Sequence, residues 1–480
     1  MRKCASWPIA LLAVIVLMLP AAAAPVFSPI VKAFVAIDDD NVAIDNVRVI
    51  DGTGAAPREA QTVVFSSGKI AAMGATGSVT VPTGAKHVDG SGMTLMPGYV
   101  GTHNHLYYVS GRSPDGFFIA REMPTSFPRM YLAAGVTTMR TTGSQEPFTD
   151  LNLRAEIDAG KAVGPNIDVT APYITGPTDT FVQMDILKDA ADARRTVDFW
   201  ADHGATSIKA YTDITHAELA AAIDEAHKRG LKVAGHLCSI GFREAAELGI
   251  DSLEHGLFVD TEIDPEKEAD HCPTTASSRA AMQSTPVDGP QIQQTIATLV
   301  AHHVAISSTL PIFESFGQRP LSQRSLAMLD SESLVDVTAS HARVMAAPRD
   351  TYEPLLKKEM AFERAFAKAG GLLTTGPDPT GSGGVIAGFG DQRGLELLVE
   401  AGFTPVEAIT IATRNGAQLL GRLKTVGTLE VGKNADAIFV KGNPAANIND
   451  IENVVYTFKN GVAFDSAKLV ESVRGIVGRR

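Results

Sequence analysis

Four histidines that follow short apolar runs are the first candidates for metal ligands in this sequence of 480 residues. His103 and His105 come directly after residues 99–102, while His236 and His255 end two later runs. An extended chain turns residues two apart to the same side, so the first two imidazoles could bind one ion. Each histidine alone could be structural, but their common position at a strand end favours a shared metal site.

A lysine and an aspartate occupy the same kind of position. Lys209 follows the apolar residues 206–208, and burial of an ammonium lowers its pKa. A neutral lysine amine can take up carbon dioxide to form a carbamate, which would be an anionic bridge between two cations; the alternative is an ion pair. Asp378 follows residues 372–376 and could bind a metal and accept a proton, although an aspartate before Pro379 is also typical of a turn.

Three further side chains could act on a substrate. Tyr211, two residues beyond Lys209, could donate to a developing oxyanion, or it could be an aromatic residue of the rim. Arg140 ends another apolar run and could bind a substrate carboxylate, with a salt bridge as the alternative. Tyr108 belongs to an aromatic cluster that could line an apolar pocket or simply pack: Tyr107, Tyr108, Phe117 and Phe118.

Eight short apolar runs that alternate with helical patterns must position these side chains. The runs are 99–102, 135–140, 166–171, 206–211, 231–236, 252–255, 305–309 and 372–376. Such alternation is typical of βα units, and eight units over residues 98–420 predict a (β/α)8 TIM barrel with insertions in an α/β fold. All six candidate ligands then lie at the carboxyl ends of the strands, which is the catalytic face of a TIM barrel.

The sequence pattern at the two ends of the chain differs from that of the middle. Residues 34–97 and 421–480 are rich in short β runs and turns, so we predict a small flanking β-sandwich domain built from both ends. Residues 1–24 combine a basic start, an apolar run over 9–19 and small residues, which is typical of a secretory signal peptide. We therefore expect an exported protein, periplasmic or extracellular.

The composition limits the kinds of partner that we expect for this protein. Hydrophobic residues make up 45% and charged residues 20%, which indicates a globular protein. The net charge is −12 and basic residues form no run, so we expect no nucleic-acid partner, and no membrane contact after removal of the signal peptide. The sequence decides neither whether Cys238 and Cys272 pair nor whether the chain forms a homo-oligomer.

The whole ligand pattern resembles the amidohydrolase superfamily, in the subgroup with two metal ions and a carboxylated lysine. Residues 97–105, PGYVGTHNH, are similar to the first-strand motif of that family, and residues 426–437 are similar to the return from the barrel into the β domain. Residues 394–405 resemble the last barrel helices of the imidazolonepropionase-like and Xaa-Pro dipeptidase-like branch.

This resemblance implies two divalent metal ions bridged by a carbamate on Lys209, formed from carbon dioxide. It divides the other ligands into two groups: His103, His105 and Asp378 for the more buried ion, and His236 and His255 for the other. Zn²⁺ suits these ligands, with Mn²⁺ and Co²⁺ as alternatives. A metal-bound hydroxide would attack the carbonyl carbon, and Asp378 would pass a proton to the leaving nitrogen.

The resulting expectation is a hydrolase of amide bonds in a small-molecule substrate, such as an Xaa-Pro dipeptide or an N-acyl amino acid. Two alternatives lie within the superfamily: opening of a cyclic amide, as in an imidazolonepropionase, and deamination. The family resemblance implies that deaminases with one metal ion generally lack a lysine at the position of Lys209. The presence of Lys209 therefore argues against deamination. A third alternative is an exported binding protein without catalysis, but six converging ligand groups argue against it.

Overall fold

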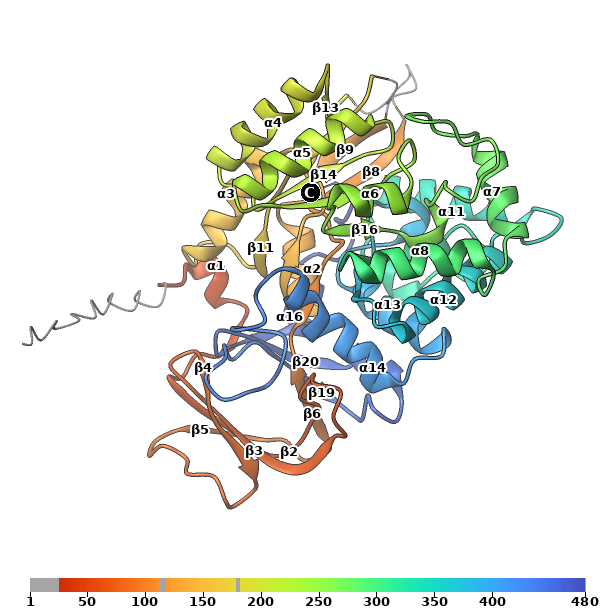
Figure 1. Cartoon of the computed structure of the whole chain (residues 1–480). Coiled ribbons are helices and arrows are strands. Elements are labelled where there is room, and N and C mark those ends of the chain that lie inside the picture. Colours follow the sequence, from red (N-terminus) through yellow and green to blue (C-terminus); the bar gives the residue numbers. More distant parts are fainter. Residues whose placement is uncertain (1–25, 113–117, 178–181, 480) are drawn as a thin grey trace, which may run out of the picture.

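The computed structural model describes residues 26–112, 118–177 and 182–479, and Figure 1 shows the course of the chain. The predicted signal peptide, residues 1–24, lies outside the described residues. In the described part, no helix is both long and apolar enough to cross a membrane.

The fold is mixed α/β, with two parallel sheets in its middle. The first has the order β11-β10-β7, and the second has the order β13-β12-β14-β15-β16-β17-β18. The strands are β7 (Tyr99–Gly101), β10 (Val136–Arg140), β11 (Asn166–Asp168), β12 (Thr170–Thr175), β13 (Asp185–Ile186), β14 (Ser207–Ala210), β15 (Lys232–Gly235), β16 (Ser252–Glu254), β17 (Ala305–Ser308) and β18 (Leu373–Thr375). Each of the eight predicted runs contains at least one of them.

The two parallel sheets meet at both of their ends. Val169 alone separates β11 from β12. At the other junction, the backbone N–H of Thr102, just after β7, donates to the carbonyl of Thr375 at the end of β18 (3.1 Å). The carboxyl ends of the first and last parallel strands are therefore neighbours.

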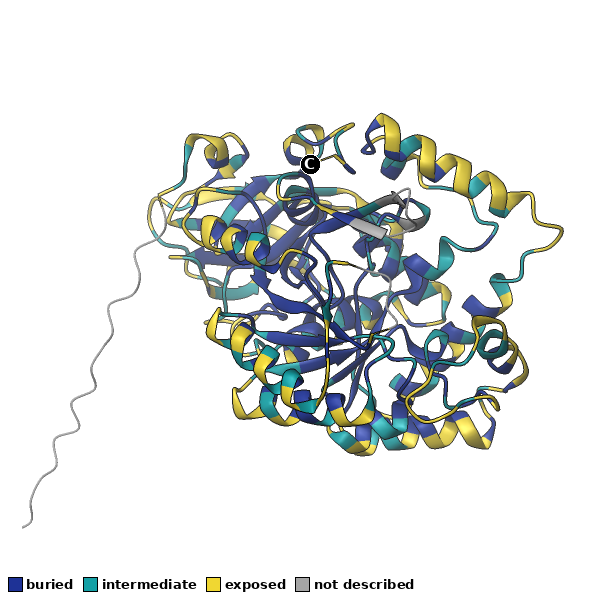
Figure 2. Cartoon of the chain, turned by 90° about the horizontal axis from the view of Figure 1, so that it is seen from above, coloured by how far each residue is buried: buried dark blue, intermediate teal, exposed yellow. Residues whose placement is uncertain are grey.

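Amphipathic helices surround the parallel strands, and Figure 2 shows buried strands inside and exposed residues on the outer helix faces. The helices with eight or more residues are α2 (Ser126–Ala133), α3 (Pro147–Asp158), α4 (Ala190–Asp202), α5 (His216–Lys228), α7 (Thr275–Ser284), α8 (Pro290–Ala301), α11 (Ser331–Met345), α12 (Glu353–Lys368) and α13 (Phe389–Glu400). Helix α5 begins at a capping box in which Thr215 and Glu218 bond each other's backbone N–H groups.

The flanking part is a nine-stranded sheet from both ends of the chain, seen below the parallel strands in Figure 1. Its order is β1-β21-β20-β19-β6-β2-β3-β4, with β5 paired to β2. The strands are β1 (Val35–Ile37), β2 (Asn41–Val49), β3 (Arg58–Ser66), β4 (Lys69–Ala75), β5 (Lys86–Asp89), β6 (Met93–Pro97), β19 (Ala437–Lys441), β20 (Val454–Lys459) and β21 (Val462–Asp465). Hydrogen bonds connect all nine strands into one sheet, and apolar side chains from these strands form a core of their own.

Two connections lie near the carboxyl ends of the parallel strands. The hairpin of β8 (Tyr107–Arg112) and β9 (Phe118–Glu122) follows the His103–His105 segment. A disulfide joins Cys238, after β15, to Cys272 in the long connection after β16. This answers the question that the sequence left open.

Candidate metal centre

All six predicted metal ligands line one cavity of about 200 Å³ at the carboxyl ends of the parallel strands. Its described lining consists of His103, His105, Tyr107, Val109, Gln145, Tyr173, Met184, Lys209, Tyr211, His236, His255, Ile312, Phe316, Asp378 and Thr380. The ligand groups lie in β14 or within four residues after the ends of β7, β15, β16 and β18, as the barrel interpretation predicts.

His103, His105 and Asp378 form the tightest part of the site, with one potential ligand atom of each within 4.8 Å of the others. Asp378 Oδ1 lies 3.0 Å from His105 Nε2 and 3.6 Å from His103 Nε2. Gly376 allows this approach, because a Cβ at its position would lie 2.5 Å from the backbone of His103. This triad has the geometry to hold a divalent cation.

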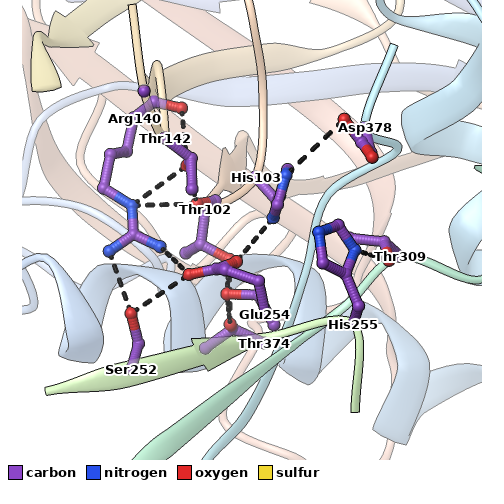
Figure 3. Close-up of polar contacts among 12 residues, drawn as sticks. Thr102, His103, Arg140, Thr142, Ser252, Glu254, His255, Thr309, Thr374 and Asp378 are labelled. Carbon is purple, nitrogen blue, oxygen red and sulfur yellow. Dashed lines mark hydrogen bonds and ion pairs between the residues drawn. The ribbon is translucent and has the colours of Figure 1, made fainter. Parts of the chain in front are cut away.

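A buried ion pair orients His103, as Figure 3 shows. His103 Nδ1 lies 2.5 Å from Glu254 Oε2, and Arg140 Nη2 donates to Glu254 Oε1 at 2.9 Å. Burial alone would raise the pKa of Glu254, but Lys209, His103 and Arg140 outweigh it and hold that pKa well below its usual range. With its Nδ1–H given to this carboxylate, His103 presents Nε2 to the cavity.

Arg140 therefore has a different position from the predicted substrate contact. It is 1% exposed, bonds Glu254, Ser252 and the Thr102 carbonyl, and is not among the described residues that line the cavity. The salt-bridge alternative describes its contacts. The sequence analysis missed Glu254, although a glutamate at the end of a predicted barrel strand, next to His255, is a usable signal.

Two other histidines are held through Nδ1 as well. His105 Nδ1 faces the carbonyls of Thr141 (3.1 Å) and Gly143 (3.3 Å), and His255 Nδ1 lies 2.8 Å from Thr309 Oγ1. Each arrangement uses Nδ1 for a partner outside the ligand set and leaves Nε2 as the potential ligand atom. His255 reaches its place with a φ of 69°, which is the left-handed region that a non-glycine residue rarely adopts.

His236 completes the histidine cluster, with its ring centroid 4.4 Å from that of His255 and 4.9 Å from that of Tyr211. Burial, followed by the charge of Lys209, lowers the pKa of His236 to about 3. The imidazole is therefore neutral at neutral pH, as a metal ligand must be.

Lys209 is buried in the middle of these ligands. It is 1% exposed, and its Nζ has no hydrogen-bond partner among the described residues. Burial lowers its pKa to about 8, although Glu254 opposes this shift. A buried amine without a partner costs free energy, so the site fits a group that would bind it.

The predicted aromatic residues differ in whether they reach the cavity. Tyr211 lines the cavity as predicted, but Tyr108 does not belong to the described lining; its ring packs beside Phe127 and its hydroxyl lies 3.4 Å from the Gly381 carbonyl. Because successive strand residues point to opposite faces, Tyr107 lines the cavity in its place. The side chains of Phe117 and Phe118 lie outside the described part of the structure.

The sequence model of the amidohydrolase family matches residues 94–463, which is most of the chain. An imidazolonepropionase of Haloarcula marismortui is 26% identical over 412 residues, covering 81% of this chain and 85% of that protein. A solved Xaa-Pro dipeptidase with bound methionine in the active site has a TM-score of 0.66 at 21% identity, over 88% of this chain and all of that one. The bottromycin amidohydrolase has a TM-score of 0.67 at 20% identity, over 93% and 92%. The chain thus belongs to the amidohydrolase family and is a hydrolase of carbon–nitrogen bonds.

Proposed function

We propose that this protein is a metal-dependent hydrolase that cleaves the amide bond of small substrates such as Xaa-Pro dipeptides or N-acyl amino acids. The observation that carries the proposal is the convergence of six ligand groups, contributed by the ends of five strands, on one cavity. A site for binding alone has no need for so many metal-ligating side chains.

The donor set suits two divalent ions, which the amidohydrolase family generally binds. His103, His105 and Asp378 would hold one ion, His236 and His255 the other, and a carbamate on Lys209 would join them. The buried and unpartnered Nζ of Lys209 supports that bridge. Imidazole and carboxylate ligands favour Zn²⁺, and the ions would supply a water of lowered pKa and polarise the substrate carbonyl.

Two side chains would act on the substrate directly. Although burial raises the pKa of Asp378, His103 and His105 hold it well below its usual range, so its carboxylate is ready to accept a proton at neutral pH. It would then deliver that proton to the leaving nitrogen. Tyr211 would donate its hydroxyl hydrogen to the carbonyl oxygen as negative charge develops there.

Two broader features belong to the proposal. The order of the parallel strands and the Thr102–Thr375 hydrogen bond support one closed (β/α)8 barrel. Export to the periplasm or the cell exterior through residues 1–24 is supported by the Cys238–Cys272 disulfide, since disulfides persist in oxidising compartments.

Hydrolysis of a cyclic amide is the second candidate, because the sequence relatives at 26% and 22% identity are named imidazolonepropionases. One experiment separates the candidates: the zinc-loaded protein is incubated with a library of dipeptides, N-acyl amino acids and imidazolone rings, and release of amine or ring opening is measured. Release of amine from the linear amides supports the proposal. Turnover of the imidazolone alone would favour the second candidate, and no turnover at all in a protein with bound metal would contradict both.

A further inference from the structure

We infer that Gln145, Tyr107 and Tyr173 form a subsite beside the metal ligands that binds an uncharged amide group of the substrate. The inference rests on the proposed function and narrows it. The preferred substrates would carry a carboxamide or a further peptide bond on the leaving-group side, as in N-acyl amino acid amides and blocked dipeptides, rather than a free carboxylate.

Gln145 is the first part of this subsite. It lies between β10 and α3, lines the cavity and is 3% exposed. Its Oε1 is buried and has no hydrogen-bond partner among the described residues. Because an unsatisfied buried acceptor is unfavourable, a ligand N–H directed at this oxygen would be favoured.

Tyr107 and Tyr173 provide the complementary group. Their hydroxyl oxygens are 2.6 Å apart, so one hydrogen lies between them and the hydrogen of the second hydroxyl is left for another acceptor. An acceptor on Gln145 next to a phenolic donor matches the N–H and C=O of an amide.

The position of the tyrosines places this subsite next to the metal ligands. The ring centroid of Tyr107 lies 4.6 Å from that of His105, and the ring of Tyr173 lies 5.1 Å from that of Tyr211. Met184 belongs to the same buried apolar cluster as these tyrosines and also lines the cavity. A group bound there would lie beside the amide being cleaved.

The charges around the subsite argue against a carboxylate ligand. Among the described side chains that line the cavity, Lys209 is the one lysine or arginine, and we assign it to the metal bridge. The guanidinium of Arg140 is bound to Glu254 instead of facing the cavity. A substrate carboxylate at Gln145 would be buried without a lysine or arginine to pair with it, whereas a carboxamide needs no such partner.

The test compares matched substrates on the metal-loaded full chain: N-acetylphenylalanine with N-acetylphenylalaninamide, and Met-Pro with Met-Pro amide. We expect kcat/KM for the amides to be higher by about tenfold or more. Gln145→Leu should reduce this ratio to about threefold or less, and Gln145→Arg should shift it toward the acids. Gln283→Leu, on the exposed face of α7, is the matched control and should leave the ratio unchanged.

A binding measurement tests the subsite independently of whether the protein hydrolyses the proposed substrates. Ketomethylene analogues of the same pairs, in which carbon replaces the scissile nitrogen (CH₂ for the N–H, CH for the prolyl nitrogen), are titrated into the metal-loaded protein by calorimetry. Tighter binding of the amide form, lost in Gln145→Leu but not in Gln283→Leu, supports the subsite even if no substrate is hydrolysed. Equal or tighter binding of the acid form, or a Gln145→Leu variant that folds and keeps the wild-type ratio, would overturn it.

Discussion

The candidate ligand histidines are held in place by side chains that are not themselves metal ligands. His103 is held by Glu254, which in turn is held by Arg140, and all three are at most 2% exposed. A carboxylate behind a ligating imidazole raises the basicity of the ligand atom and fixes the ring. Glu254 is therefore a positioning residue of the site.

Replacing Glu254 tests this role. Glu254→Gln keeps a hydrogen-bond acceptor but removes the charge, so we expect the affinity for Zn²⁺ to fall by about 10–100-fold, measured by competition with a chelator. Glu363→Gln is the control, because Glu363 is equally buried and bonds Ser308 rather than a candidate ligand. Unchanged affinity in a folded Glu254→Gln variant would contradict the assignment.

Lys209 gives a second prediction for single residues. If its carbamate joins the two ions, Lys209→Ala should bind fewer than two ions per chain and lose activity, with metal content measured by elemental analysis. Lys459→Ala is a matched control, because burial also lowers the pKa of Lys459 to about 8, but this side chain is half-buried and its Nζ donates to the Gly164 carbonyl. Two bound ions and full activity in Lys209→Ala would refute the role.

Site residues were predictable where a residue type that binds metal stood at the end of a predicted strand, as for His236 and Asp378. Which of two neighbouring side chains reaches the cavity was not predictable, because this depends on the direction in which each side chain points. Tyr107 and Tyr108 are adjacent and chemically identical, and only the register of the hairpin puts Tyr107 in the cavity. Gln145 follows no pattern at all, because its unpartnered oxygen is a property of the folded surroundings.

At the scale of elements, the parallel strands were predictable because each is a short apolar run followed by a turn or ligand. Apart from β13 (Asp185–Ile186), which no predicted run covers, the observed parallel strands begin or end within a few residues of the predicted runs; for example, β14 covers Ser207–Ala210 within the run 206–211. The connections were harder, since a loop has no periodicity. The disulfide between two of them depends on a distance, 5.1 Å between Cα atoms, that the sequence does not contain.

This disulfide connects the elements that carry two of the ligands. Cys238 lies two residues after His236, and Cys272 Sγ lies 3.4 Å from the carbonyl of Thr212, which follows Tyr211. The bond closes a loop with a sequence separation of 34 residues, which corresponds to about 3–4 kcal/mol of unfolding free energy. We expect Cys272→Ser to lose this amount, measured by urea unfolding.

A reductant provides the matched comparison for this prediction. Dithiothreitol should lower the unfolding free energy of the wild type to that of Cys272→Ser and leave the variant unchanged. Equal stability of the wild type with and without the reductant would show that the bond contributes nothing.

At the scale of the whole molecule, two distant parts of the chain form one sheet. Strand β6 pairs with β19 in antiparallel register, Leu95 opposite Phe439, and the sheet packs beside the parallel strands. Both β-rich ends were visible in the sequence. Their pairing order was not, because partners so far apart in the chain are selected by long-range packing rather than by local pattern.

Asp436 joins this sheet to the parallel strands. Its Oδ1 accepts from the backbone N–H of Asn460 at 2.6 Å, and its Oδ2 accepts from Asn166 at the start of β11 (3.5 Å). The residue is 4% exposed, and burial raises its pKa to about 6, against the hydrogen bond from Asn460 and the charge of Lys459. Ionisation of this carboxyl therefore works against the folded state.

The sign of the resulting pH dependence follows from proton binding. Between about pH 4 and pH 6 the folded protein holds this proton and the unfolded chain does not, so the stabilisation by Asp436 is complete below pH 4 and decreases as the pH rises. Relative to Asp436→Asn, the wild type should lose on the order of 3 kcal/mol of unfolding free energy between pH 4 and pH 7. The measurement is urea unfolding of both proteins across this range. Asp39→Asn, at an exposed position, is the control and should differ from the wild type by a constant amount. If the Asp436→Asn difference is equally constant, the carboxyl does not hold a proton in the fold, and the contact between the two sheets must then carry a charge that its other neighbours compensate.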